Sequence, residues 1–286
     1  MKVLITGAAG SVGHQALLAF SAAGHDVVCT DIVEDKNVSF KFIKGNLTDP
    51  FFVANLLKDE KPDIVVNCAA IVDIGKSYKD LRRVNFDAVA TLFDRCCFMG
   101  VARLIHISTG SLYKPGNVPH VENEEIKFGN DYEKSKFDAE KYLLKAYNEN
   151  ILKDRFVSKV SILRPTLIYG PRSRVLFSSM ACIPEILKSF RIKKVPQLIG
   201  GPKTNLVHCE DVARICLHLA EDDFGSRGFE IYNASDLDPM PFFEFMNPIN
   251  EIGGLELTDT KVGPYKFFKI MPQQFKIILY LEHLIS

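Results

Sequence analysis

A tyrosine and a lysine stand four residues apart, at Tyr132 and Lys136, in the segment Tyr-Glu-Lys-Ser-Lys. On a helix this spacing places the phenol and the ammonium group on the same face. A free tyrosine has a pKa of about 10, and a nearby positive charge favours the phenolate. The pair therefore predicts a general acid/base that exchanges a proton with a substrate alcohol near neutral pH. An isolated Tyr-x-x-x-Lys segment is more typical of a surface helix, so this assignment requires further support.

Hydroxyl side chains follow the strand that precedes this helix. The predicted strand covers residues 104–108, and hydroxyl groups stand at Ser108, Thr109 and Ser111. Ligands bind in the crevice outside the carboxyl ends of central parallel strands. We therefore expect these hydroxyl groups to face the same crevice as the tyrosine and the lysine.

Three glycines, Gly7, Gly10 and Gly13, directly follow the first predicted strand and open the first predicted helix. Glycine permits a tight turn, the approach of backbone N–H groups to a pyrophosphate, and close helix packing. About 20 residues further on, Asp31 ends the second strand, where a carboxylate can bind the hydroxyl groups of an adenosine ribose. The same carboxylate repels a 2′-phosphate, and no arginine follows it closely. The sequence therefore predicts NAD rather than NADP.

Alternating strands and helices must position these residues. The apolar patterns predict strands at residues 3–6, 26–30, 39–43, 64–67, 104–108 and 157–163, and helices at 12–23, 50–58, 80–99 and 132–148. This alternation is typical of a parallel sheet covered on both faces. After Pro165 the pattern loosens, with a short helix at 210–221 and a strand at 229–232. We therefore predict a cofactor domain over residues 1–165 and a smaller substrate lobe over residues 166–286.

The composition restricts the possible functions. The chain has 286 residues, of which 47% are hydrophobic, and 35 Lys plus Arg balance 35 Asp plus Glu. Such a chain can bury a large core and lacks the basic footprint of a nucleic-acid-binding protein. The seven cysteines form no C-x-x-C pair and no metal-like cluster with histidine, which indicates reduced thiols and no metal site. With no signal peptide and no apolar run of about 20 residues, the expected location is the cytoplasm.

The spacing Gly-x-x-Gly-x-x-Gly of residues 7–13 resembles the loop of short-chain dehydrogenases/reductases. Further motifs resemble their extended branch, the NAD-dependent epimerase/dehydratase family. The segment at residues 205–213 is similar to that family's Val-His-Val-Asp-Asp-Val-Ala, so the resemblance covers nearly the whole chain. It implies an α/β fold with a doubly wound parallel sheet (Rossmann fold) of about seven strands, with NAD across their carboxyl ends. A smaller α/β C-terminal lobe would bind the substrate.

The resemblance also implies roles for individual residues. Thr109 matches the catalytic Ser/Thr that binds the substrate oxygen, with Ser108 and Ser111 as weaker candidates. Tyr132 would be the general acid/base, and Lys136 would hold the nicotinamide ribose while lowering the pKa of Tyr132. The residues expected at the cofactor are Gly7, Gly10, Ser11, Val12, Gly13, Asp31, Asn46, Leu47, Cys68, Ala69, Ala70, Asn85, Tyr132, Lys136 and Pro165.

Two of these positions have specific expectations. Asn46 replaces the first aspartate of the family's Gly-Asp-Leu-Thr-Asp, so its amide oxygen would accept a hydrogen bond from adenine without a charge. Asn85 matches an asparagine of a family helix and would support the site. An equally good interpretation of Asn85 is a polar residue packed beside another subunit or domain.

The reaction type is less restricted than the fold. Dehydratases of this family carry Asp-Glu after the catalytic threonine, whereas this chain has Gly110 and Ser111, which disfavours elimination. Epimerases usually place an arginine where Thr204 stands, although Arg172, Arg174, Arg191, Lys193 and Lys194 could serve instead. Segments at residues 69–75 and 263–286 resemble 3-beta-hydroxysteroid dehydrogenases and related reductases of lipid-like ketones.

These observations favour an NAD-dependent oxidoreductase that interconverts a secondary alcohol and a ketone by hydride transfer. The alternatives are a nucleotide-sugar 4-epimerase with tightly bound NAD and a non-catalytic dinucleotide-binding sensor. The expected partner is a small-molecule substrate. The apolar C-terminal tail could cover the site, lie on a membrane surface or pack on the second lobe. Helices at residues 80–99 and 132–148 correspond to those that pair in dimers of many relatives, so we predict a homodimer.

Overall fold

The computed structural model describes residues 1–34, 40–113, 119–173, 177–221, 228–263 and 266. The chain forms two units, of which the first contains residues 1–171 and 207–235. Its elements in chain order are β1 (Lys2–Thr6), α1 (Ser11–Ala22), β2 (Asp26–Asp31), β3 (Lys41–Lys44), α2 (Pro50–Glu60), β4 (Ile64–Asn67), α3 (Tyr78–Arg82), a π-helical turn (Arg83–Asp87), α4 (Ala88–Met99), β5 (Arg103–Ile107), a 3₁₀ turn (Gly110–Leu112), α5 (Asp131–Leu152), β6 (Lys159–Pro165), β7 (Leu167–Tyr169), β10 (Leu206–His208), α7 (Cys209–Glu221) and β11 (Phe229–Ala234).

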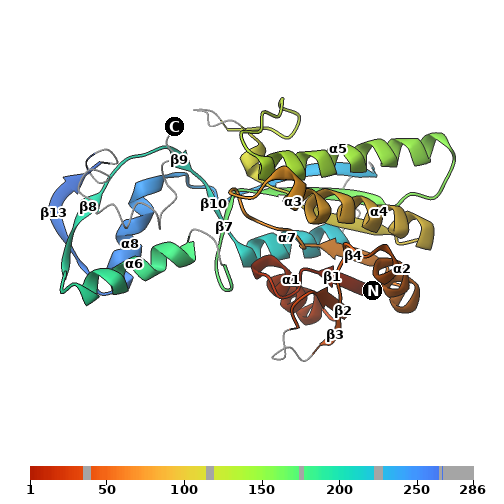
Figure 1. Cartoon of the computed structure of the whole chain (residues 1–286), viewed down its shortest axis with the longest axis horizontal. Helices are drawn as coiled ribbons and strands as arrows, with labels where there is room; N and C mark the ends of the chain where they lie inside the picture. Colours follow the sequence, from red (N-terminus) through yellow and green to blue (C-terminus); the bar gives the residue numbers. More distant parts are fainter. Residues whose placement is uncertain (35–39, 114–118, 174–176, 222–227, 264–265, 267–286) are drawn as a thin grey trace. The chain divides into compact units, whose positions relative to one another are not determined.

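A seven-stranded parallel sheet forms the centre of the first unit. Its strand order is β11-β6-β5-β4-β1-β2-β3, so the order reverses between β1 and β4. Helices α1 and α7 cover one face of the sheet, while α2, α4 and α5 cover the other (Figure 1). Ligands in doubly wound sheets bind outside the carboxyl ends of the strands at such a reversal. The predicted Rossmann fold of about seven strands is confirmed.

Side chains of the central strands alternate between the two faces. In β1, Val3 and Ile5 join the core beneath α1 and α7, whereas Leu4 joins the core beneath α2, α4 and α5. All three side chains are fully buried. This alternation follows from the two-residue period of a strand, and burial on both faces explains the continuous apolar runs in the sequence.

The single boundary predicted after residue 165 differs from the observed division. Residues 207–235, which the sequence assigned to the second lobe, belong to the first unit. Strand β11 pairs in parallel with β6 and completes the sheet at its edge. Helix α7 buries Val212, Ala213 and Cys216 in the same core as α1. The chain returns to the first sheet because these apolar faces are covered there and not in the second unit.

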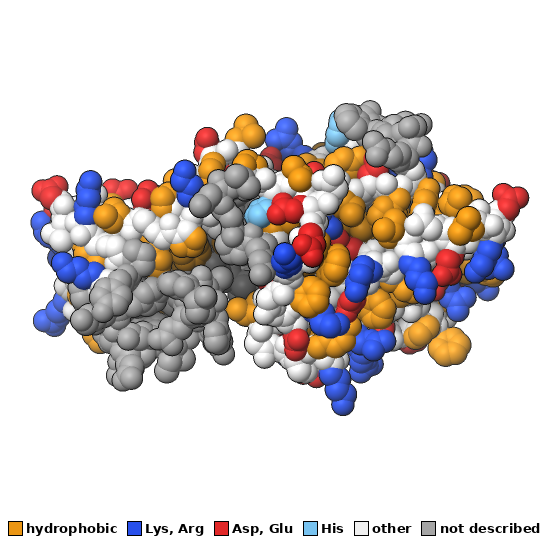
Figure 2. Space-filling view, turned by 90° about the horizontal axis from the view of Figure 1, so that it is seen from above, with side chains coloured by type: hydrophobic (Ala, Val, Ile, Leu, Met, Phe, Trp, Pro, Cys, Tyr) orange, Lys and Arg blue, Asp and Glu red, His pale blue; other side chains and the backbone are white. Residues whose placement is uncertain are grey.

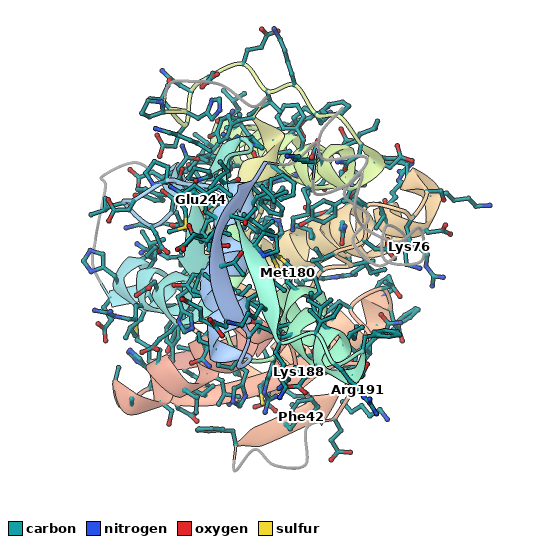
Figure 3. The ribbon with its side chains drawn as sticks, turned by 90° about the vertical axis from the view of Figure 1, so that its left-hand side faces the viewer. Phe42, Lys76, Met180, Lys188, Arg191 and Glu244 are labelled. Carbon is teal, nitrogen blue, oxygen red and sulfur yellow. The ribbon has the colours of Figure 1, made fainter. Side chains whose placement is uncertain are left out.

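The second unit contains residues 172–206 and 236–286. Strands β8 (Lys194–Leu198) and β13 (Glu256–Val262) pair in parallel, and β9 (Lys203–Thr204) and β12 (Met240–Pro241) pair antiparallel. On α6, Met180 is buried, whereas Lys188 near the other end of the helix is exposed (Figure 3). Its elements are α6 (Phe177–Ser189), β8 (Lys194–Leu198), β9 (Lys203–Thr204), β12 (Met240–Pro241), a 3₁₀ turn (Phe242–Phe245), α8 (Met246–Ile252) and β13 (Glu256–Val262).

The predicted elements agree with the observed ones to within a few residues, with one informative interruption. The helix expected over residues 80–99 contains the π-helical turn Arg83–Asp87 between α3 and α4. Of the apolar tail, residues 264–265 and 267–286 lie outside the described part of the chain. None of the described helices combines the length and apolar character that crossing a bilayer requires.

Candidate active site

The glycine loop between β1 and α1 lies tightly against its neighbours. Gly7 has a φ of +66°, and a Cβ atom at this position would lie 2.6 Å from the backbone nitrogen of Ala69. A Cβ atom on Gly13 would lie 2.2 Å from the carbonyl oxygen of Gly7. Both positions therefore require glycine, one because of its left-handed backbone and both because a side chain would meet backbone atoms. The loop is thus fixed directly beside the segment that follows β4.

Helix α1 begins at this loop without a side-chain cap. Gly10 is its N-cap residue, and no side chain accepts a hydrogen bond from the first turn. The Ser11 hydroxyl instead donates to the carbonyl oxygen of Pro171 at 2.8 Å. Uncapped N–H groups and the positive end of the helix dipole suit an anion. Gly7, Gly10 and Gly13 with the start of α1, including Ser11 and Val12, therefore fit the pyrophosphate of a dinucleotide.

Asp31 at the end of β2 holds the glycine loop from the other side. Its Oδ2 accepts a hydrogen bond from the Ala9 backbone nitrogen at 3.0 Å, and its Oδ1 accepts one from Val33 at 3.2 Å. A carboxylate has about four lone-pair sites, so acceptor capacity remains for ribose hydroxyl groups. The position of Asp31 beside the loop therefore fits the adenosine end of the same dinucleotide.

Residues expected to line the cofactor lie after β3 and β4. The Oδ1 atom of Asn46 already accepts hydrogen bonds from the backbone nitrogen and the hydroxyl of Thr48, both at 3.0 Å. An adenine amino group would compete with these bonds, so the Asn46 contact stays a prediction. Leu47 is buried. The segment from Cys68 to Ala70 follows β4 directly, and the backbone N–H of Cys68 donates to the carbonyl oxygen of Thr6.

The π-helical turn places Asn85 inside the protein. Its Oδ1 accepts a hydrogen bond from the Ile71 backbone nitrogen at 2.8 Å, and its Nδ2 donates to the Ile71 carbonyl and the Ser135 hydroxyl, both at 3.0 Å. The extra residue in the turn moves this polar side chain to a fully buried position. Asn85 therefore fastens the segment after β4 to α5 within one chain.

Thr109 and Tyr132 lie together at the carboxyl end of β5. Both are buried, each with 8% of its surface exposed, and Thr109 lies close enough to the phenol to influence its pKa. Burial raises the pKa of the Tyr132 phenol to about 12, the Thr109 hydrogen bond lowers it, and the Glu133 charge raises it further. In the ligand-free protein, Tyr132 is therefore protonated at neutral pH.

The two weaker hydroxyl candidates have other partners. The Ser108 hydroxyl donates to Glu140 at 2.5 Å, and Glu140 forms a buried ion pair with Arg164 at 2.6 Å. The Ser111 hydroxyl is exposed and lies 2.9 Å from that of Thr109. Of the three hydroxyl groups, that of Thr109 is the one that influences the pKa of Tyr132.

Gly110 and Pro165 bring the ends of β5 and β6 together. A Cβ atom on Gly110 would lie 3.0 Å from the Pro165 carbonyl oxygen. This close approach explains why the position after Thr109 carries no side chain. It also places the predicted cofactor residue Pro165 next to the Thr109 segment.

Lys136 lies one turn after Tyr132 but is directed to β5. Its Nζ donates to the Ile107 carbonyl oxygen at 2.6 Å and lies 3.4 Å from His106 Nε2. Burial lowers the pKa of Lys136 to about 8, against smaller raising effects of Glu140 and Cys68. Within the described residues, no hydrogen bond joins Lys136 to Tyr132, and a lowering of the Tyr132 pKa by Lys136 stays a prediction.

His106 is a residue of this site that the sequence patterns did not predict, and it contacts Asn67 at the end of β4. Both side chains are buried, at 0% and 1% exposure, and they contact each other next to Lys136. The available signal was a histidine in the apolar strand Leu-Ile-His-Ile and an asparagine ending another. A buried polar side chain in a central strand needs a partner, which indicates a polar network.

Replacement of Lys136 by methionine tests the burial of this cation. Unfolded lysine has a pKa of about 10.4, so the unfolded chain binds one more proton than the folded protein between about pH 8 and pH 10.4. The free energy of unfolding of the wild type therefore increases as the pH rises through this window, whereas that of the variant does not. We expect the stability of Lys136→Met relative to the wild type to fall by about 2 kcal/mol between about pH 7.5 and pH 10. Urea denaturation of the ligand-free proteins measures this change, and a difference that is constant with pH would contradict it.

Comparisons with known proteins identify relatives of this chain. A beta subunit of methionine adenosyltransferase 2 from Danio rerio is 26% identical over 249 residues, covering 82% of this chain and 69% of that protein. A UDP-glucose 4-epimerase from Mycolicibacterium smegmatis is 27% identical over 187 residues, covering 60% of this chain and 58% of that protein. The chain therefore spans less than two thirds of the epimerase.

Solved structures share the fold. MoeE5 in complex with UDP-glucose and NAD superposes with a TM-score of 0.74 at 21% identity, covering 98% of this chain and 92% of that one. A UDP-glucose 4-epimerase from Thermotoga maritima also gives 0.74 at 20% identity, covering 92% and 86%. The NAD dependent epimerase/dehydratase family profile matches residues 3–235, which include the glycine loop, Thr109, Tyr132 and Lys136. The chain belongs to the NAD dependent epimerase/dehydratase family.

Proposed function

We propose that this protein oxidises and re-reduces a carbinol carbon of its substrate, with Tyr132 as the general acid/base. The observation that carries this proposal is the burial of Tyr132 beside Thr109, at the carboxyl end of β5 in the sheet that also carries the glycine loop. A hydroxyl pair at this edge of the sheet can hold a substrate oxygen and exchange its proton. When bound, NAD supplies the hydride acceptor and donor.

Three residues of the chain would have separate roles in this reaction. The Thr109 hydroxyl would hold the substrate oxygen, and the phenol of Tyr132 would donate or accept its proton. Because the phenol is protonated in the ligand-free protein, proton donation to a ketone oxygen needs no prior change of charge. Proton acceptance requires the phenolate, which a cation near the bound substrate would favour. Lys136, one turn away, is the buried cation available for this role.

We propose a nucleotide sugar as the substrate, which makes the reaction an epimerisation with no net change of NAD. The support comes from the relatives, because the epimerase from Mycolicibacterium smegmatis and the structures cited above carry UDP-glucose in their names. A net oxidation of another secondary alcohol uses the same residues and differs only in its products. The Gly110–Pro165 contact disfavours the acidic side chain that a dehydratase places after the threonine.

A second candidate is a cofactor-binding subunit of another enzyme. The observation in its favour is the similarity over 82% of the chain to a protein named as the beta subunit of a methionine adenosyltransferase. Such a role would need the dinucleotide cradle but not the Tyr132 and Thr109 hydroxyl groups. A cytoplasmic location suits both candidates and stays a prediction.

The products separate these candidates. We incubate the protein with NAD and UDP- or GDP-sugars, hydroxysteroids or hydroxyacyl compounds, and measure NADH absorbance and sugar isomers. An epimerase gives isomers without net NADH, a dehydrogenase gives NADH, and a binding subunit gives neither. Tyr132→Phe should lower turnover by about 10²–10⁴-fold because it removes the proton donor but keeps the ring.

Tyr142→Phe is the matched control on the same helix. Its hydroxyl bonds to Asp94 in an exposed position, so we expect its turnover to match that of the wild type. Full turnover by a folded Tyr132→Phe protein would show that Tyr132 is not the acid/base. The absence of every product from the wild type would favour the binding subunit.

The cofactor preference tests the role of Asp31. We expect NAD to bind at least about tenfold more tightly than NADP, because the carboxylate repels a 2′-phosphate. Asp31→Asn removes the charge but keeps an oxygen that can accept from Ala9, so it should reduce the difference without loosening the loop. Titration calorimetry with both nucleotides measures this. Tighter binding of NADP by the wild type would refute the assignment.

We propose a homodimer through α4 and α5. Exposed apolar side chains lie on both helices, with 76% of Phe98 and 85% of Leu152 accessible, and hydrophobic side chains are interspersed with basic ones on the face shown in Figure 2. Light scattering should give twice the mass of one chain at micromolar concentration. Phe98→Glu should weaken the dimer, whereas Phe51→Glu, at an equally exposed phenylalanine on α2, should not. A single-chain mass for the wild type would contradict the prediction.

A further inference from the structure

Four buried polar side chains form a continuous chain from β1 to α5. The Thr6 hydroxyl lies 2.6 Å from Asn67 Oδ1, and Asn67 Nδ2 lies 3.0 Å from His106 Nδ1. His106 Nε2 lies 3.4 Å from Lys136 Nζ, which also donates to Ile107. None of the four side chains is more than 1% exposed. The chain therefore links the strands on both sides of the crevice to the lysine of the site.

The imidazole of His106 is neutral. Full burial and the charge of Lys136 hold its pKa well below its ordinary value. A neutral imidazole has one N–H group and one lone pair, so its two ring nitrogens must play opposite roles. If Nδ1 accepts from Asn67, Nε2 carries the proton, and the reverse holds if Nδ1 donates.

This series of hydrogen bonds can therefore run in either of two directions, with every donor matched to an acceptor. With Lys136 as a neutral amine, Asn67 donates its N–H to His106 Nδ1, and His106 donates from Nε2 to Nζ. With Lys136 as an ammonium ion, Nζ donates to Nε2, and His106 donates from Nδ1 to the amide oxygen of Asn67 after a half-turn of the amide. The Thr6 hydroxyl can either donate or accept, so it can adjust to both directions.

We propose that His106 is a positioning residue for Lys136, and that the Asn67 amide serves as the partner of His106 Nδ1 whether that nitrogen accepts or donates. The four hydrogen-bonded side chains keep the Lys136 amine in one buried position, both as an ammonium ion and as a neutral amine. The inference deepens the proposed function, because Lys136 is the cation assigned there. Without His106, the buried Nζ of Lys136 would keep only the Ile107 carbonyl as a partner, and a polar atom left partly unsatisfied in the interior costs free energy.

Other titratable groups face Lys136 and must be held constant in a test. Glu140 on the same helix is fixed by its ion pair with Arg164 on β6. Cys68 on the β4 side keeps its proton because burial raises its pKa to about 12, and the Cys216 thiol beyond it on α7 is also raised. Tyr132, one turn before Lys136 on the same helix, is the last of these titratable groups. A substitution at His106 or Asn67 leaves all of these in place.

The test follows the titration of Lys136 in the ligand-free protein by ¹³C and ¹⁵N NMR of labelled lysines. The resonance is identified by its loss in Lys136→Met. His106→Phe keeps the ring shape but removes the acceptor of the ammonium ion, so the Lys136 pKa should fall by about one unit, a tenfold change in the ammonium-to-amine ratio. His106→Gln, whose amide oxygen can accept from Nζ, should restore part of the shift.

Asn67→Asp should shift the Lys136 pKa in the direction opposite to that expected for His106→Phe. It presents an acceptor to Nδ1 in every orientation, which leaves Nε2 as the acceptor for the ammonium ion, and its negative charge acts in the same direction. The Lys136 pKa should therefore rise. A Lys136 titration that is unchanged in both His106→Phe and Asn67→Asp, or that moves in the same direction in both, would overturn the proposal.

Two features keep this test decisive. If His106→Phe does not fold, as circular dichroism would show, His106→Leu takes its place, because it also removes the acceptor for Nζ, and an unchanged Lys136 pKa in that variant contradicts the proposal. No cofactor or substrate is present during the titration. A protein without turnover would refute the proposed function and leave this inference standing, and an unshifted titration would refute the inference without affecting Tyr132.

Discussion

One buried stripe of α5 connects the sheet to the proposed chemistry. Tyr132, Lys136 and Glu140 recur every four residues, so they lie on one face of the helix. Tyr132 lies beside Thr109, Lys136 donates a hydrogen bond to the Ile107 carbonyl, and Glu140 accepts hydrogen bonds from Ser108 and Arg164. Three successive polar groups thus dock the helix on the ends of β5 and β6. Because each is buried, misplacement of the helix would leave unpaired polar groups, and this fixes the geometry of the site.

The second constraint lies at the reversal of strand order between β1 and β4. Gly7 and Gly13 allow the loop after β1 to lie directly against the segment after β4 and against α1, while Asp31 holds the loop from β2. Asn85 fixes the segment after β4 to α5. The cradle and the helix with Tyr132 are therefore parts of one hydrogen-bonded frame, which explains why the family pattern spans them together.

Short-range patterns predicted much of this frame. The glycine spacing, the aspartate after the second strand and the Tyr132–Lys136 pair indicated the fold and the site, because each depends on a single local element. The pairing of strands that are distant in the sequence could not be predicted from these local patterns. The return of β11 to pair with β6 placed residues 207–235 in the first unit. The partners of His106, the separation of Ser108 from Thr109 and the direction of Lys136 also depend on contacts between distant strands.

The central claim is that Tyr132 and Thr109 serve the transfer of a hydride from a carbinol carbon. The most direct measurement is turnover of UDP-glucose that carries deuterium at carbon 4, compared with the unlabelled compound in the presence of NAD. The account predicts interconversion of the sugars that is slower with deuterium, because the C–D bond breaks in the reaction. Turnover at the same rate with both compounds, with chemistry as the rate-limiting step, would contradict it.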